Sequence, residues 1–197
     1  MQYSIFEEDT IYEYFILLSP NWGVKSKVRE MKSALDAMIG LNPENMKSFA
    51  HISLYKQKAT EAMQVSKKIK KLLNGQKKFT VSLQGHDVFK QGDKRTLYLK
   101  IENPEPIENL LALLNPPKKA APVNRQTSIL DKPKRVTKKI TPHLTIARNI
   151  AKADFERIAD FTPFDYHAKW ECDKVSILRR VWGTNDTYDS VGEINLL

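Results

Sequence analysis

TPHLTIAR, residues 141–148, has the alternation of a β-strand whose two faces differ. Successive side chains of a strand point to opposite sides, so Leu144 and Ile146 share one face while His143 and Thr145 share the other. One face is therefore apolar, and the other carries an imidazole and a hydroxyl. This combination indicates a strand that contributes both to a core and to a site.

A second stretch repeats the pattern. AHISLYK, residues 50–56, places His51, Ser53 and Tyr55 on one face and aliphatic side chains on the other. The bare tripeptide, His followed two positions later by Ser or Thr, is weak evidence, since two chance copies are expected in roughly one such chain in sixteen. Both copies, however, lie in apolar runs and precede a segment with helical spacing. The chain thus repeats a unit and not only a tripeptide.

The remaining elements are predicted from hydrophobic spacing and from turn residues. In chain order we predict a strand at 11–18, a helix at 24–39, the first His strand, a helix at 60–73, a hairpin of strands at 79–89 and 96–102, a helix at 107–114, the second His strand, a helix at 152–159, and strands at 166–178 and 188–195. Each half then gives helix, His strand, helix, strand, strand, with the first strand outside the repeat. Two such units packed about a pseudo-two-fold axis would place the two His faces opposite each other across a cleft.

Length and composition suit one globular unit. The 197 residues are 41% hydrophobic and 28% charged, and we expect residues 1–197 to form a single domain of two similar lobes. The N-terminal stretch lacks the pattern of a secretory signal, and no apolar run is long enough to span a membrane. The one cysteine, Cys172, excludes an intramolecular disulfide and a cysteine-only metal site. We expect a monomeric, cytoplasmic protein that does not bind membranes.

The net charge of +9 is concentrated in one segment. Residues 116–140 carry eight basic residues and one acidic residue, show no helical or strand spacing, and are predicted to form a long loop before the second His strand. Such a cluster suits phosphate or nucleic acid, although charged, proline-containing loops are often merely solvated. The candidate RNA contacts are Lys118, Lys119, Arg125, Lys134, Arg135, Lys138 and Lys139.

Two histidines that face each other can act as a general base and a general acid, because imidazole titrates nearest neutral pH. Adjacent hydroxyls can donate hydrogen bonds to a dispersed negative charge, so the set suits a phosphodiester and requires no metal or cofactor. The two other histidines, His86 and His167, have the neighbours Asp87 and Asp165. No four-ligand set is visible around them, and we predict no metal site.

Several stretches of the chain resemble the 2H phosphoesterase superfamily. They are the motifs HISL and HLTI, the run PHLTIAR, the early strand YFILLSP and the late stretches VSILRR and TYDSVGEINL. Within the superfamily, the similarity is to the bacterial RNA 2′,3′-cyclic phosphodiesterases, also called 2′-5′ RNA ligases. The resemblance implies an α+β fold of two lobes, with antiparallel sheets forming a central cleft and helices outside. It also implies that His51 and His143 are the catalytic pair and that Ser53 and Thr145 hold the phosphate. The long basic segment departs from the family's usual pattern.

Three functions remain open on the sequence. The favoured one is a hydrolase that opens 2′,3′-cyclic phosphate ends of RNA or cleaves 2′-5′ linkages, with ligation as the reverse reaction. The alternatives are a hydrolase of a small cyclic nucleotide or phosphate metabolite, and a non-catalytic RNA-binding module on the same fold. Tyr55 and Tyr98 are candidate contacts for a base or other part of the substrate, although tyrosines in strands more often serve packing. The sequence leaves open which histidine is the acid and which the base.

Overall fold

The computed structural model describes residues 10–116 and 141–197. Apart from Pro116, the basic loop predicted at 116–140 lies outside the described residues, and so do all seven candidate RNA contacts, so both stay predictions. No helix in the two described stretches is long and apolar enough to cross a membrane.

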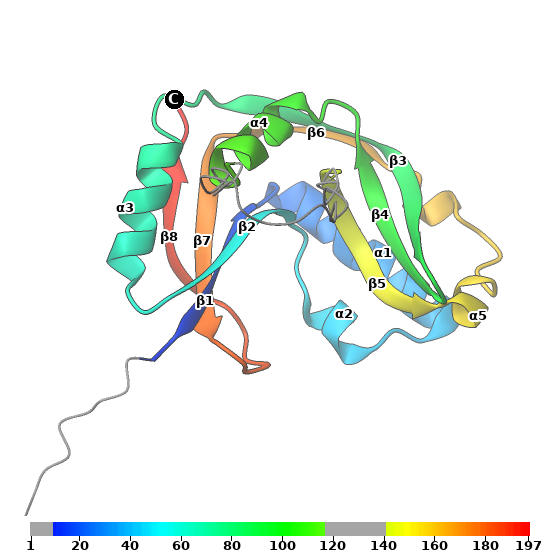
Figure 1. Cartoon of the computed structure of the whole chain (residues 1–197). Coiled ribbons are helices and arrows are strands. Elements are labelled where there is room, and N and C mark those ends of the chain that lie inside the picture. Colours follow the sequence, from blue (N-terminus) through cyan, green and yellow to red (C-terminus); the bar gives the residue numbers. More distant parts are fainter. Residues whose placement is uncertain (1–9, 117–140) are drawn as a thin grey trace, which may run out of the picture.

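Two four-stranded antiparallel sheets form the frame of the molecule (Figure 1). The first sheet has the order β2 (Ile52–Ala59), β1 (Tyr12–Leu18), β7 (Lys174–Val181), β8 (Asp189–Asn195). The second has the order β5 (His143–Ala151), β4 (Lys94–Ile101), β3 (Phe79–Gln91), β6 (His167–Cys172). Each sheet therefore carries one His strand at its edge, β2 in the first and β5 in the second. This arrangement confirms the predicted bilobal α+β fold with a duplicated unit.

The helices link the two sheets. They are α1 (Trp22–Ile39), α2 (Pro43–Lys47), α3 (Ala62–Leu72), α4 (Glu105–Leu114), α5 (Lys152–Phe155) and a 3₁₀ turn (Thr162–Phe164). Helix α1 follows β1 of the first sheet but packs against β5 of the second, whereas α4 follows β4 of the second sheet and packs against β2 of the first. This exchange of helices ties the lobes together, and Figure 1 shows α3 on the outer side of the first sheet.

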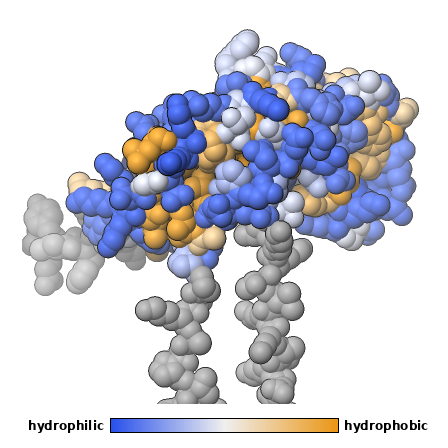
Figure 2. All heavy atoms as spheres, turned by 90° about the horizontal axis from the view of Figure 1, so that it is seen from above, coloured by the Kyte–Doolittle hydropathy of each residue, from blue (hydrophilic) through white to orange (hydrophobic). Residues whose placement is uncertain are grey.

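Strand β1 shows how the sheets divide their side chains. Tyr14, Ile16 and Leu18 join the main core, while Phe15 and Leu17 are buried on the opposite face and are not part of that core cluster. The strand thus has two apolar faces, as its continuous hydrophobic run indicates. Seen from above, most of the visible surface is hydrophilic, with smaller apolar patches (Figure 2). Most apolar strand and helix faces are accordingly turned inward.

The first strand is not outside the repeat, contrary to the prediction. In the first sheet β1 lies next to the His strand β2, and in the second sheet β4 lies next to the His strand β5. Each of these strands leads through a helix to its His strand: β1 through α1 and α2, β4 through α4. The repeated unit therefore begins with a strand, and the first lobe is completed by β7 and β8 from the end of the chain.

Two predicted elements need correction, and one helix was missed. The strand predicted at 166–178 is two strands, β6 and β7, which lie in different sheets. The buried apolar positions mark the crossing between the sheets. They are even-numbered in β6, at Trp170 and Cys172, and odd-numbered in β7, at Val175 and Ile177, so the alternation shifts by one residue. The helix predicted at 152–159 covers only Lys152–Phe155. Helix α2 was not predicted, although Asn42 caps it and a proline occupies its first turn, a recognisable start signal.

Candidate active site

The two histidines have matching local geometry. His51 immediately precedes β2, and His143 is the first residue of β5. The Nδ1 atom of each ring lies 2.8 Å from the carbonyl oxygen of the residue two positions earlier, Phe49 for His51 and Thr141 for His143. A carbonyl oxygen can only accept, so each Nδ1 carries a hydrogen and donates it. The Nε2 atom of each ring is then the one left to exchange a proton with a bound molecule.

Strands β2 and β5 belong to different sheets, yet they contact each other. The edge strands that carry the histidines therefore meet where the two lobes join. We call the side of each sheet that bears the histidine its histidine face. On β5 and β4 this face holds Thr145 opposite Tyr98 and His143 opposite Lys100. On β2 and β1 it holds Ser53 opposite Leu17 and Lys56 opposite Phe15.

Aromatic rings hold both imidazoles edge-on. The Phe15 ring lies 5.1 Å from that of His51 at an interplanar angle of 90°. The Phe89 ring lies 4.9 Å from that of His143 at 83°, and Tyr98 lies 5.3 Å from the same imidazole. Phe89 and Tyr98 also stack on each other at 4.1 Å. Edge-to-face contacts of this kind restrict ring rotation, so each imidazole is oriented by its carbonyl and by its aromatic neighbours.

The predicted hydroxyls lie beside the histidines. Ser53 is exposed on β2 and Thr145 is half-buried on β5, each two positions after its histidine. Within the described parts of the chain, neither hydroxyl makes a hydrogen bond. Both are free to donate to a ligand on the histidine faces, which is the arrangement predicted from the alternation.

Positive charge gathers around His51. Burial lowers the pKa of the His51 imidazole, and the nearby charges of Lys32, Arg148 and Lys56 lower it further, although the bond to the carbonyl of Phe49 acts in the opposite direction. The neutral ring, with an unprotonated Nε2, is thereby favoured. Arg148 belongs to β5, the strand of His143, so its effect on His51 reaches across the junction of the lobes.

Glu13 of β1 is the anion in this positive region. Its carboxylate accepts hydrogen bonds from the hydroxyl of Tyr188, from Lys56 at 3.2 Å and from Arg180 at 3.0 Å. Burial alone would raise the pKa of Glu13, but these bonds and the two cationic charges outweigh it and lower the pKa. Glu13 stays ionised, and it fixes Lys56 beside Phe15, whose ring centre is 4.6 Å from the ammonium nitrogen.

The two candidate tyrosines lie in different places. Tyr98 is beside His143, and burial together with the carboxylate of Asp87 raises the pKa of its phenol to about 12, so the hydroxyl stays protonated. On β2, a bulge makes Ile16 pair with Tyr55 and Leu17 with Ser53, which leaves Leu54 as an extra residue. The expected alternation fails there. Tyr55 packs against the core, and Lys68 of α3 covers its ring at 5.4 Å.

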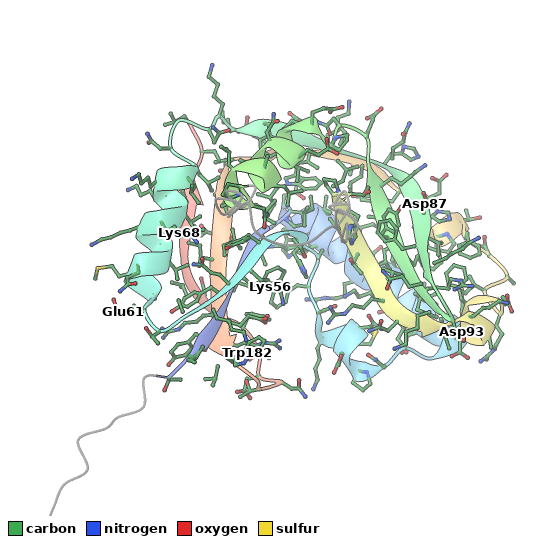
Figure 3. The ribbon with its side chains drawn as sticks, in the orientation of Figure 1. Lys56, Glu61, Lys68, Asp87, Asp93 and Trp182 are labelled. Atoms are coloured by element: carbon green, nitrogen blue, oxygen red, sulfur yellow. The ribbon has the colours of Figure 1, made fainter. Side chains whose placement is uncertain are left out.

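Lys56 takes the place on the histidine face that was expected for Tyr55. Figure 3 shows Lys56 directed toward the space between the sheets, whereas Lys68 belongs to the outer helix α3. The sequence offered no signal for this exchange, because a bulge depends on how β2 pairs with β1. Lys32 did have a signal, since it lies four positions after Val28 and three before Leu35, on the buried face of a helix.

The other histidines are engaged elsewhere. His86 stacks on Phe161 at 5.4 Å, and His167 lies 3.3 Å from a carboxylate oxygen of Asp165. Two surface hollows of about 610 and 380 Å³ lie in this region, and neither is lined by His51 or His143. Among the residues that the structure describes, no three His, Cys, Asp or Glu side chains come together as metal ligands.

Comparisons with known proteins agree with this geometry. The model of the 2′-5′ RNA ligase superfamily matches residues 25–184. Among solved structures, TT0787 of Thermus thermophilus is similar with a TM-score of 0.62 and 16% identity, over 93% of this chain and 97% of that one. LigT of E. coli in its apo form follows with a TM-score of 0.58 and 14% identity, over 94% and 98%. No curated protein matches the sequence. The structural likeness shows a shared fold, and the family model shows that the chain belongs to the 2′-5′ RNA ligase superfamily.

Proposed function

We propose that this protein is a phosphodiesterase that opens 2′,3′-cyclic phosphate ends of RNA or cleaves 2′-5′ linkages, with His51 as general base and His143 as general acid. One observation carries the proposal: both histidines donate through Nδ1 to a backbone carbonyl at 2.8 Å, on edge strands that meet between the lobes. Both rings therefore present Nε2 for proton transfer. The pair can complete the reaction without a metal or another cofactor.

The assignment of roles follows from the charges. A general base must be unprotonated, and burial together with three nearby cations lowers the pKa of His51. His51 Nε2 takes a proton from water as the water oxygen attacks phosphorus. The bond from phosphorus to one ribose oxygen breaks, and His143 Nε2–H gives its proton to that departing oxygen. Proton exchange with solvent resets both rings, and the roles reverse in ligation.

The remaining groups act on the phosphate. Negative charge develops on the non-bridging oxygens as phosphorus gains a fifth bond, and donors placed in advance stabilise that charge most. Ser53 and Thr145 supply hydroxyls from the two sheets, and Lys56 and Arg148 supply positive charge close to His51. Phe89 is half-buried and stacks on the buried ring of Tyr98, and it offers an aromatic surface beside His143 that suits a nucleobase or a ribose.

The similar structures support a nucleotide substrate. LigT of E. coli has been solved with 3′-AMP, at a TM-score of 0.52 and 15% identity to this chain. A nucleoside monophosphate with its phosphate on the 3′ oxygen has the chemical form of one product of opening a 2′,3′-cyclic phosphate. By analogy, we infer an RNA or nucleotide substrate for the present chain.

The test is incubation of the purified protein with a short RNA that ends in a 2′,3′-cyclic phosphate, in the presence of EDTA, with products followed by phosphorus NMR. We expect opening by the wild type, loss of opening in His51→Ala and His143→Ala, and wild-type activity in the control His167→Ala. Undiminished turnover by either of the first two variants would refute the two-histidine mechanism. Turnover of small cyclic nucleotides without any opening of RNA would favour the metabolite hydrolase, and salt-sensitive RNA binding without turnover would favour the binding module.

A further inference from the structure

A lysine is buried behind the candidate active site. Lys32 of α1 is only 3% exposed. Its ammonium group donates to the backbone oxygen of Asn45 at 2.7 Å, to the hydroxyl of Ser48 at 2.7 Å and to the backbone oxygen of Ser48. All three acceptors are uncharged, and no carboxylate of the described residues pairs with this lysine. A buried charge without a counter-ion is costly to a fold, so its presence calls for a reason beyond packing.

The segment that Lys32 holds leads directly to His51. Ser48 is bound both to Lys32 and, through its hydroxyl, to the backbone oxygen of Asn45 at 3.0 Å. The next residue, Phe49, provides the carbonyl that orients the His51 ring. Lys32 therefore fixes the backbone at Ser48, immediately before the Phe49 carbonyl that keeps the hydrogen of His51 on Nδ1.

Asn45 connects the same segment to the other histidine strand. This side chain is 6% exposed, and it makes a two-way amide bridge to the backbone of Arg148, donating to the carbonyl and accepting from the N–H, both at 3.0 Å. Arg148 lies on β5, the strand that begins with His143. Helix α2, which contains Asn45, packs against both α1 and β5. Figure 1 shows α2 near the lower end of β5.

We propose that Lys32 and Asn45 are positioning residues that set the distance and orientation between His51 and His143. Hydrogen bonds and short covalent links together connect the two histidine strands. The His51 ring is bound to the carbonyl of Phe49, the backbone leads from there to Ser48, Lys32 joins Ser48 to the backbone of Asn45, and the Asn45 side chain binds the backbone of β5. The inference rests on the proposed function, because two proton-transfer groups need a fixed separation. A displacement of about 1 Å in such a pair can reduce the rate about 100-fold.

The charge of Lys32 adds a second effect. Its ammonium and the guanidinium of Arg148 both favour a neutral His51 ring, and they also oppose each other. Burial and Arg148 lower the pKa of Lys32 to about 8, so the ammonium is largely protonated at neutral pH. If Lys32 served only to satisfy buried carbonyls, its replacement would change neither the separation of the two histidines nor the pKa of His51.

The test compares Lys32→Met with Lys25→Met, which changes an exposed lysine on the same helix. For opening of the cyclic phosphate we expect Lys32→Met to lower kcat about 10- to 100-fold with little change in KM, and Lys25→Met to behave as the wild type. In NMR titrations of the imidazoles, the midpoint of His51 should move to higher pH in Lys32→Met. Wild-type kcat and an unmoved midpoint in a folded Lys32→Met protein would overturn the proposal.

Asn45→Ala separates position from charge and serves if Lys32→Met does not fold. It removes the bridge to Arg148 but keeps the backbone oxygen that Lys32 binds, so kcat should fall about 10-fold or more while the His51 midpoint stays in place. Wild-type kcat in Asn45→Ala would refute the bridge between the strands. If the wild type opens no cyclic phosphate, the proposed function fails. The nitrogen chemical shifts of His51 still test whether Lys32 holds the backbone that orients the His51 ring. A loss of the Nδ1–H signature in Lys32→Met would support it, and an unchanged signature and midpoint would overturn it.

Discussion

The two histidines share a backbone geometry and differ in their surroundings. Each donates from Nδ1 to a carbonyl at 2.8 Å, and each lies edge-on to a phenylalanine. Around His51, however, the structure brings together the positive charges of Lys32, Lys56 and Arg148. Beside His143 it places the stacked rings of Phe89 and Tyr98. The repeated motif thus sets which nitrogen of each ring faces away from the backbone, and the unrepeated neighbours are the basis for the two different roles that we propose.

The largest effects are expected from the histidines themselves. His51→Ala and His143→Ala should each lower kcat/KM about 100- to 10,000-fold, the usual contribution of a general base or acid. The wild-type profile should lose activity as the pH falls through the pKa of free His51, because the base must be neutral. Since that pKa is lowered, this acid limb should lie below the ordinary value of about 6.5.

Residual activity in the two variants tests the assignment of roles. His51→Ala should lack the acid limb, because the titrating base is gone, whereas His143→Ala should keep it. The measurement is kcat/KM against pH for each variant with a cyclic phosphate substrate. The opposite pattern would exchange the roles of the two histidines and show that the cations near His51 do not select the base.

Next in size are the hydroxyls, which belong to the repeated part of the site. Ser53→Ala and Thr145→Val should each reduce kcat/KM about 10- to 100-fold, because each removes one donor to the developing charge. The effects should be similar in the two variants, and the pH limbs should not move. A large loss for one hydroxyl and none for the other would show that the phosphate is bound by a single lobe. Thr60→Ala, which changes an exposed hydroxyl just beyond the end of β2, is the control.

A smaller effect is expected from the unrepeated charge of Arg148. Arg148→Gln should lower kcat/KM about tenfold at neutral pH and move the acid limb upward, since one of the charges that favour neutral His51 is removed. The backbone bonds to Asn45 remain available in this variant. Arg179→Gln is the matched control, because Arg179 lies over the ring of Tyr12 at 4.6 Å, outside the cluster of charges around His51. Equal effects of the two substitutions would mean that general surface charge, and not position, matters.

The same contrast between repeated and unrepeated parts explains what the sequence could predict. Alternation along a strand and helical spacing depend on local periodicity, so β1, α1, β4 and the two His strands were predicted close to their observed ranges. The crossing from β6 to β7 was missed because alternation within a stretch does not reveal which sheet its residues join, although the phase of the buried apolar positions changes there. The two motifs also placed His51, Ser53, His143 and Thr145 on the histidine faces, as the structure shows.

What the sequence did not predict depends on tertiary contacts. The position of Lys56 follows from a bulge in the pairing of β2 with β1, and the role of Asn45 follows from a bridge between α2 and β5. Neither contact can be predicted from the spacing of apolar residues along the sequence. Lysine at a buried helical position was visible in the sequence at Lys32, yet its acceptors come from a segment without regular spacing, Asn45 to Ser48.

The smallest expected difference lies between the two tyrosines, and it tests the bulge directly. Tyr98→Phe should lower kcat/KM about two- to fivefold, because it keeps the ring beside His143 but removes a hydroxyl bound to Asp87. Tyr55→Phe should leave kcat/KM unchanged, since its ring lies under Lys68 on the core side of β2. A loss in Tyr55→Phe larger than that in Tyr98→Phe would place Tyr55 on the histidine face, as simple alternation predicts. Lys56 would then lose its place beside Phe15, and the excess of positive charge that distinguishes His51 from His143 would have to come from Lys32 and Arg148 alone.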